Sequence, residues 1–293
     1  MPLSARKSAR DISYATAVRG KGARALIRLI ENSTGRLALI KRAQGYEREM
    51  RSGRVFFDVM MEKYGLSLEV TQGSLAHIPC SGPLILVSNH PYGLLDGLTL
   101  GHMLAQRRHD FKILTHAVFG GVPDLARYVL PISFEADKQA LALNLSTRKQ
   151  ALGHLEHGGA IGIFPGGTVS TAIRPFAKPF DPTWRRFTGR MIEKSQAQVV
   201  PVYFDGQTSR LFQIASHLHH ALRMGLMMRE FRSRLDTPVR VAIGHPVDPE
   251  GLAARAGNSK AIMAFLRKAT YEMSAKPDCF SQIGFDFERD GRA

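Results

Sequence analysis

Apolar positions in the first 65 residues recur at the three- and four-residue spacing of amphipathic helices. Two such stretches, around 25–30 and 37–42, carry Arg and Lys on their polar side and are separated by a break at 32–35. A third stretch, 55–64, is more apolar and stops near Gly65. The pattern predicts a basic, amphipathic helical segment over 1–65. This segment either packs on the rest of the protein or associates with a membrane, its apolar side chains among the head groups and its basic side chains at lipid phosphates.

From residue 66 onward, short β-type runs alternate with helical stretches. Strands are predicted at 83–88, 111–115, 160–164, 199–204 and 239–243, and helices at 98–106, 137–157 and 212–234. Runs at 66–70 and 75–78 flank a Gln-Gly pair and predict a hairpin. Strands that alternate with helices predict an α/β domain over 66–293, with a mixed, largely parallel sheet covered by helices.

Composition narrows the class of protein. The chain is 44% hydrophobic and 22% charged, as in ordinary globular proteins. It has no apolar run near the roughly 18–20 residues that cross a bilayer. Cys80 and Cys279 lie far apart without neighbouring thiols, which predicts neither a disulfide framework nor a zinc site and favours a cytoplasmic setting. The first two dozen residues lack the apolar core of a secretory signal, and a transit peptide is the alternative for them.

The formal net charge is +15, from 40 Lys and Arg against 25 Asp and Glu. Residues 1–60 hold thirteen basic and five acidic side chains, a net of +8, so about half of the excess lies in a fifth of the chain. Such an excess attracts polyanions, of which nucleic acid and anionic lipid are the two candidates. Only 8% of residues are aromatic, and the chain shows no signature of a nucleic-acid-binding strand platform or recognition helix. Anionic lipid is therefore favoured over nucleic acid.

Residues able to do chemistry follow two of the predicted strands. After the strand at 83–88, His90 and Asp96 are separated by five residues, which on a regular helix would put them on different faces. A fold-back of the backbone at Gly93 would let them meet. A carboxylate on one ring nitrogen fixes the tautomer of the imidazole and makes the other nitrogen a general base. Taken alone, such a pair is either structural or catalytic, and Asn89 is either a helix cap or part of a site.

The second strand end, at 163–170, places Gly166 and Gly167 before Thr168 and Ser170. Backbone N–H groups exposed in such a turn hold a phosphate or stabilise an oxyanion. No Lys follows as in a phosphate-binding P-loop, so nucleotide binding is disfavoured. Taken alone, this stretch is also compatible with a plain tight turn.

Together the two ends resemble the glycerolipid acyltransferase superfamily, which includes the lysophosphatidic acid acyltransferases. The resemblance is to its bacterial, hemolysin-like branch, with N-H-P-x-G-x-L-D-G at 89–97 and F-P-x-G-x-x-S at 164–170. One extra residue stands between His and Asp, compared with the superfamily's N-H-x4-D. Further matches follow in order at 130–132, 158–160, Trp184, 200–206 and Ser209, so that the resemblance covers roughly 66–246.

The resemblance implies acyl transfer from a thioester, on acyl carrier protein or coenzyme A, to the hydroxyl of a lyso-lipid. His90 would take the hydroxyl proton and Asp96 would orient His90, with no acyl-enzyme and no role for a cysteine. The amides around Gly166 and Gly167, with Thr168, would face the oxyanion or the acceptor's head group. The substrate-binding set that the resemblance implies is completed by Asn89, Gly93 and Ser170. No metal and no tightly bound cofactor is expected, and the expected setting is peripheral, on the cytoplasmic face of a bacterial inner membrane.

Departures from the family pattern concern the acceptor. Gly166 and Val169 replace the Glu and Arg of the F-P-E-G-T-R-S motif, and no clear equivalent of the family's phosphate-binding Arg lies near 131–135. We therefore expect a lyso-aminolipid of the ornithine lipid type as acceptor, with lysophosphatidic acid as the alternative. Cations that could replace the missing charge are Arg127, Arg148 and Arg174.

The stretch 217–234 contains histidines, methionines and arginines that allow further interpretations. His217, His219 and His220 lack a convincing further metal ligand nearby, so we interpret them as a polar helix face. The neighbouring Met and Leu residues, with Arg223, Arg229, Arg232 and Arg234, form either a membrane- or carrier-binding surface or a core stripe with a basic edge. A non-catalytic lipid- or carrier-binding relative is the remaining alternative, which the intact His and Asp argue against.

Overall fold

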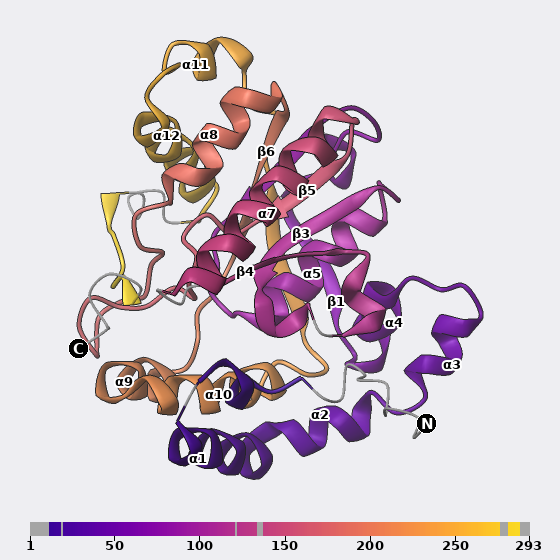
Figure 1. The fold of residues 1–293 in the computed structure, drawn as a ribbon, viewed down its shortest axis with the longest axis vertical. Helices are drawn as coiled ribbons and strands as arrows, with labels where there is room; N and C mark the ends of the chain where they lie inside the picture. Colours follow the sequence, from indigo (N-terminus) through magenta and orange to yellow (C-terminus); the bar gives the residue numbers. More distant parts are fainter. Residues whose placement is uncertain (1–11, 19, 121, 134–136, 276–280, 288–293) are drawn as a thin grey trace.

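The computed structural model describes residues 12–18, 20–120, 122–133, 137–275 and 281–287. Cys279 and the first basic residues, Arg6, Lys7 and Arg10, lie outside the described residues. Within the described part, the centre is a seven-stranded sheet in the order β1-β7-β6-β2-β5-β3-β4 (Figure 1). The strands are β1 Ser67–Gly73, β2 Leu84–Ser88, β3 Phe111–His116, β4 Val129–Ile132, β5 Ala160–Ile163, β6 Gln198–Phe204 and β7 Pro238–Ile243.

All neighbouring strands run parallel except β6 and β7, which are antiparallel. The predicted α/β fold with a mixed, largely parallel sheet is therefore confirmed. The predicted hairpin is wrong, because β1 pairs in parallel with β7 and is followed by a 3-10 turn, η4 (Leu75–His77). Gly73 at φ +77° ends the strand, and the hydroxyl of Ser74 accepts the N–H of Ala76 to start that turn.

The helices are α1 Lys21–Glu31, α2 Leu37–Arg42, α3 Tyr46–Arg51, α4 Phe56–Lys63, α5 Leu94–Ala105, α6 Pro123–Ala126, α7 Lys138–Glu156, α8 Arg186–Ser195, α9 Arg210–Leu218, α10 His220–Arg232, α11 Pro249–Ala253 and α12 Ser259–Glu272. Short turns are η2 Tyr14–Ala17, η3 Asn32–Arg36 and η5 Ala117–Phe119. The single helix predicted at 212–234 is in fact two, α9 and α10, since His219 is extended and caps α10. None of the described helices combines the length and apolar character needed to cross a bilayer.

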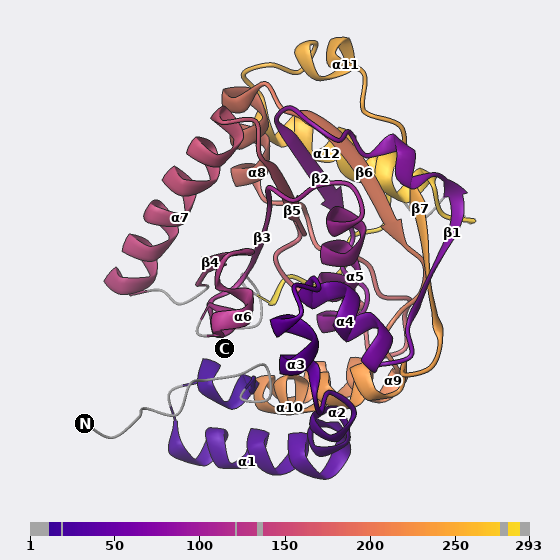
Figure 2. The same ribbon diagram turned by 90° about the vertical axis from the view of Figure 1, so that its right-hand side faces the viewer.

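Helices cover both faces of the sheet (Figures 1 and 2). On β2, Ile85 and Val87 belong to the core cluster under α7, α8 and α12, whereas Leu84 and Leu86 belong to the one that includes α4 and α5. Successive side chains of a strand point to opposite faces, so a run that is buried throughout must be covered on both. β2 and β6 are both such central strands, and the chain leaves each of them at the same end of the sheet.

A layer of helices lies across that end: α1, α2, α9 and α10 (Figure 1). The predicted break at 32–35 is instead a π-helical turn, η3, which continues α1 into α2. A Cβ on Gly35 would overlap the carbonyl of Met228 on α10, so glycine allows the turn to approach that helix closely. Tyr14 and Ile27 belong to the same hydrophobic core cluster as Leu84 and Phe204, and α1 packs against α10. The division of the chain at residue 65 stays a prediction.

Candidate active site

The loop after β2 brings His90 and Asp96 together. The Nδ1 of His90 lies 3.0 Å from Oδ2 of Asp96. The imidazole also stacks on Phe164, with ring centroids 4.1 Å apart and planes 23° from parallel. The His90 side chain is 17% exposed and that of Asp96 is fully buried. A carboxylate on Nδ1 holds the proton on that nitrogen and leaves Nε2 to accept one, which is the arrangement that a general base needs.

Gly93 makes this contact possible. It has φ +81° and precedes α5, so that the carboxylate of Asp96, in the first turn, points back over the loop. Oδ2 of Asp96 accepts the N–H of Tyr92 at 2.7 Å and that of Gly93 at 2.9 Å. A Cβ on Gly93 would overlap Cε of Met227 on α10 and come within 3.0 Å of Val169. Glycine is therefore required both by the backbone angle and by the space.

Burial and hydrogen bonding act in opposite directions on the pKa of the Asp96 carboxyl. Burial raises the pKa of its carboxyl above the ordinary value, and the hydrogen bonds from His90 and from the loop amides act in the opposite direction. Within the described part of the chain, its other oxygen, Oδ1, is buried without a hydrogen-bond partner. The charge of Asp96 is thus held by one imidazole and by the amides at the start of a helix.

The glycine stretch after β5 forms a tight turn beside His90. The N–H of Gly167, at φ +74°, donates to the carbonyl of Phe164 at 3.0 Å. Among the described residues, the N–H groups of Gly166 and Thr168 find no acceptor. The N–H of Ser170 donates to the carbonyl of His90 at 2.7 Å, which joins the two strand ends. Unused amides next to an imidazole form an arrangement that can receive a developing oxyanion.

Asp181 fixes both strand ends and was not among the residues predicted from the sequence. Its Oδ1 accepts the N–H of His90 at 3.1 Å and the hydroxyl of Ser170 at 2.5 Å. Its Oδ2 accepts the indole N–H of Trp184 at 2.8 Å, and its own N–H donates to the hydroxyl of Tyr271 at 2.9 Å. The only available signal was its position three residues before Trp184, which belongs to the family pattern.

Arg223 was also missed, because we interpreted it as part of either a membrane- or carrier-binding surface or a basic helix edge. Its guanidinium is instead buried under the glycine turn, with the residue only 1% exposed. It donates to the carbonyl of Val169 at 2.9 Å and to the hydroxyls of Thr168 and Thr171 at 3.1 and 2.8 Å. A cation therefore lies directly behind the turn whose sequence lacks the family's own Arg.

The other predicted residues take different places. Asn89 is buried and bridges β2 to β6, since its side chain accepts the N–H of Phe204 at 2.7 Å and donates to its carbonyl at 2.9 Å. Arg127 stacks on Tyr128, and Arg148 lies over Phe187.

Nε2 of His217 donates to the backbone carbonyl of Ala172, 2.9 Å away. Among the described residues, no group of three His, Cys, Asp or Glu side chains is arranged to hold a metal ion.

Comparison with known proteins supplies a family. A family model described as acyltransferase matches residues 12–279. Two relatives are named lyso-glycine lipid O-acyltransferase. The one from Phocaeicola vulgatus is 26% identical over 169 residues, and the one from Bacteroides thetaiotaomicron is 28% identical over 179 residues. These matches span 57% and 60% of this chain and 57% and 62% of the relatives, which is less than two thirds of their lengths.

Solved structures are also similar to this chain. One of them is the 1-acyl-sn-glycerophosphate (LPA) acyltransferase PlsC from Thermotoga maritima, which is 16% identical. The match has a TM-score of 0.42 and covers 82% of this chain and 89% of that one.

Proposed function

The chain belongs to this acyltransferase family, and we propose that it moves a fatty acyl group from a thioester to the hydroxyl of a lyso-lipid. The observation that carries the proposal is the contact of 3.0 Å between His90 and the buried Asp96, beside a turn with unused amides. No metal or tightly bound cofactor is part of it. The acyl donor is a thioester of acyl carrier protein or coenzyme A.

In this mechanism Nε2 of His90 takes the proton of the acceptor hydroxyl as its oxygen attacks the thioester carbonyl carbon. Asp96 keeps Nδ1 protonated and stabilises the imidazolium that forms. The negative carbonyl oxygen of the tetrahedral intermediate is met by the N–H groups of the glycine turn, such as those of Gly166 and Thr168. When the intermediate collapses, the carbon–sulfur bond breaks and the thiolate takes the proton back from His90. An ester and a free thiol result.

The proposed acceptor is a lyso-aminolipid, an amino acid N-acylated by a fatty chain. Two observations support it: the names of the two relatives, and Gly166 and Val169 in place of the family's Glu and Arg. Both the ornithine type and the glycine type fall in this class. Lysophosphatidic acid is the second candidate, and the buried guanidinium of Arg223 behind the glycine turn is the observation that favours it.

We further propose that the layer of helices at the sheet end lies on an anionic membrane, at the cytoplasmic face of a bacterial inner membrane. Leu26, Leu29 and Leu37 on α1 and α2 are 40%, 67% and 56% exposed, among basic residues. Leu218, the last residue of α9, is 70% exposed. Exposed leucines among cations are typical of helices that lie in the head-group region.

The proposal is tested by incubating the purified chain with an acyl thioester and a panel of lyso-lipids. The panel contains N-acyl glycine, N-acyl ornithine and glycerophosphate types, each with one free hydroxyl. Ester formation is expected for the wild type with at least one amino acid lipid, and a loss of about 10²–10⁴-fold for His90→Ala. Retention of wild-type turnover by both His90→Ala and Asp96→Ala would show that another group removes the proton.

A further inference from the structure

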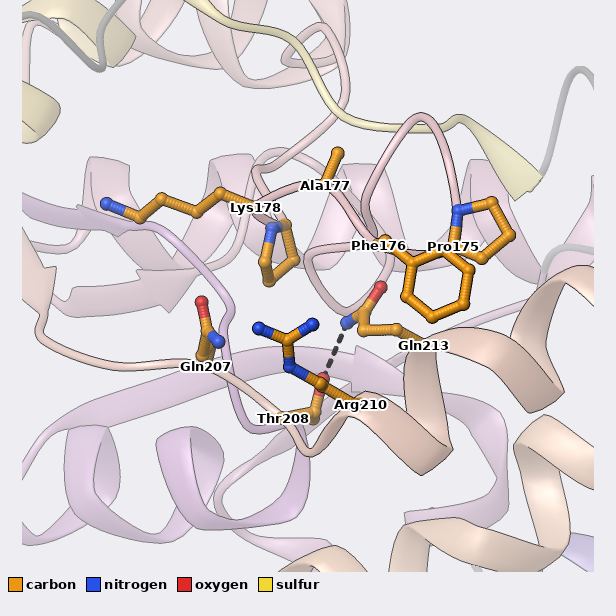
Figure 3. Close-up of a pocket in the computed structure, with 9 residues that line it drawn as sticks. Pro175, Phe176, Ala177, Lys178, Gln207, Thr208, Arg210 and Gln213 are labelled. Atoms are coloured by element: carbon orange, nitrogen blue, oxygen red, sulfur yellow. Dashed lines mark hydrogen bonds between the residues drawn. The ribbon is translucent and has the colours of Figure 1, made fainter.

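A pocket outside the His90–Asp96 contact opens between two loops (Figure 3). One wall is the stretch Pro175 to Pro179, which includes the exposed ring of Phe176. The other wall is Gln207 and Thr208, after β6, with Arg210 and Gln213 from the first turn of α9. Its volume is about 210 Å³. Nothing in the mechanism above uses this pocket.

The charged side chains in the pocket lining, Lys178 and Arg210, are both positive. Figure 3 shows the guanidinium of Arg210 in the middle of the lining residues, whereas the side chain of Lys178 extends away from them. The ammonium of Lys178 lies 5.4 Å from the centre of the Phe180 ring. Arg210 forms no ion pair with any described residue, and the lining set contains no Asp or Glu. A guanidinium that points into a pocket without a carboxylate selects an anion, and it matches a carboxylate or phosphate best.

Hydrogen bonds connect this pocket to the proposed reaction centre. Nε2 of Gln213 donates to the hydroxyl of Thr208 at 2.7 Å and to the carbonyl of Ser170 at 3.2 Å. The N–H of the same Ser170 donates to the carbonyl of His90 at 2.7 Å. Only one residue and two hydrogen bonds therefore separate the buried floor of the pocket from the backbone of His90.

We propose that this pocket binds the acidic head group of the lipid acceptor, with Arg210 holding the carboxylate of its amino acid; this inference rests on the proposed function. The volume of about 210 Å³ suits a head group and is below the range of sites for drug-sized ligands. Because glycine has no hydroxyl, the accepting hydroxyl of a glycine lipid is carried by its N-acyl chain. The head group of such a lipid is thus separated from the hydroxyl by only a few bonds.

The same pocket discriminates between amino acids. The ornithine side chain ends in an ammonium, which a carboxylate stabilises best and which Arg210 repels. The described lining offers it no carboxylate. A head group with a carboxylate and no cation, such as glycine, fits these walls better. Within the lyso-aminolipid class, the structure therefore assigns the acceptor to the glycine type rather than to the ornithine type.

The first test is binding by the full chain, measured by titration calorimetry. The probes are N-(3-hydroxyoctanoyl)glycine and its methyl ester, which lacks the negative charge and carries one additional methyl group. We expect the wild type to bind the acid at least tenfold more tightly than the ester, and Arg210→Ala to bind the two equally. Arg190→Ala removes another exposed charge, on α8, and is expected to keep the preference. A wild type without the preference, or Arg210→Ala with it, would overturn the proposal.

The second test is turnover with the same acid, an acyl thioester and the same variants. Arg210→Ala is expected to raise the KM for the lipid at least tenfold with little change in kcat or in the KM for the thioester. A rise confined to the thioester KM, or a preference for lysophosphatidic acid that depends on Arg210, would overturn the carboxylate assignment. If the wild type binds the acid selectively but transfers no acyl group, the proposed function is refuted and the pocket assignment stands. If acyl transfer occurs but does not depend on Arg210, the pocket assignment is refuted and the proposed function stands.

Discussion

Oδ1 of Asp181 accepts the backbone N–H of His90, 3.1 Å away, although the two residues come from loops that follow different strands. The same oxygen accepts the hydroxyl of Ser170 in the glycine turn. One buried carboxylate therefore sets the distance between the proposed base and the proposed oxyanion site. It acts on backbone and hydroxyl groups, not on substrate, which makes Asp181 a positioning residue.

Replacing Asp181 by Ala is expected to loosen both loops at once. The N–H of His90, the hydroxyl of Ser170 and the indole N–H of Trp184 would lose their acceptor, at about 1–3 kcal/mol for each buried donor left unpaired. We expect a clear fall in the melting temperature and in kcat. Trp184 is the only tryptophan of the chain, so its fluorescence reports the change directly.

The matched control for this prediction is Ser170→Ala. It removes the Ser170 hydroxyl and its hydrogen bond to Asp181, but leaves no buried donor without an acceptor. Its melting temperature and tryptophan emission should change much less than those of Asp181→Ala. Equal effects of the two substitutions would mean that Asp181 does not join the loops.

Asp96→Asn is expected to separate activity from stability. Burial raises the pKa of Asp96 in the folded chain, while in the unfolded chain it stays near 4. Between these two values the folded state binds a proton that the unfolded state does not, so wild-type stability falls as pH rises through this window. Asn cannot ionise, and its carbonyl can still accept from the amides of Tyr92 and Gly93.

We therefore expect the melting temperature of Asp96→Asn relative to the wild type to increase with pH from about 4 upward and then to level off. Turnover should nevertheless fall by about 10²–10⁴-fold, because Nδ1 of His90 loses its carboxylate. Thermal melts at several pH values and one activity assay test both parts. A relative melting temperature that declines as pH rises would show that the ionised carboxylate stabilises the fold.

The sequence predicted the elements that carry the site because their signals are local. The strands before His90 and Gly166 are apolar runs bounded by Asn, Pro and Gly, and a run of this kind predicts a buried strand. The edge strand β4 was missed because it is four residues long and contains Pro131. The hairpin was predicted wrongly because Gly73 signals a chain reversal equally well before a 3-10 turn.

Asp181 and Arg223 escaped prediction for a different reason. Their partners lie far away in the chain: Asp181 bonds to His90, and Arg223 bonds to Thr168 and Val169. Nothing in the residues next to either one indicates burial, since isolated Asp and Arg are ordinarily solvent-exposed. Only the tertiary structure reveals that these two charges support the loops of the candidate site.

Gly93→Ala is expected to disturb the contact between His90 and Asp96 through two separable effects. A Cβ is strained at φ +81°, and it would also overlap Cε of Met227. The first effect costs about 1–3 kcal/mol and no neighbour can relieve it. The second should be relieved by Met227→Ala, so the double variant should be destabilised by less than the sum of the single variants. Additive changes in the free energy of unfolding would argue against the close packing of α10 on this loop.

Leu29→Ser tests the proposed membrane surface, because this side chain is 67% exposed on α1 and has no evident role in the core. If it enters the head-group region, its loss removes about 1.5–3 kcal/mol of apolar burial and should weaken binding to phosphatidylglycerol vesicles about tenfold or more. Leu141 on α7 is 61% exposed, and Leu141→Ser is therefore the matched control for Leu29→Ser.

Flotation of Leu29→Ser and Leu141→Ser with phosphatidylglycerol and with phosphatidylcholine vesicles gives the measurement. Wild-type binding should prefer the anionic vesicles and weaken as salt is added, because the basic side chains of α1 and α2 contribute through charge. Leu141→Ser should bind as the wild type does. If the two variants bound equally, α1 would not be the surface that meets the membrane, and the exposed leucines of α9 would become the next candidates. Because α9 also carries Arg210, a membrane at that surface would place the acceptor's head group next to the pocket that we assign to it.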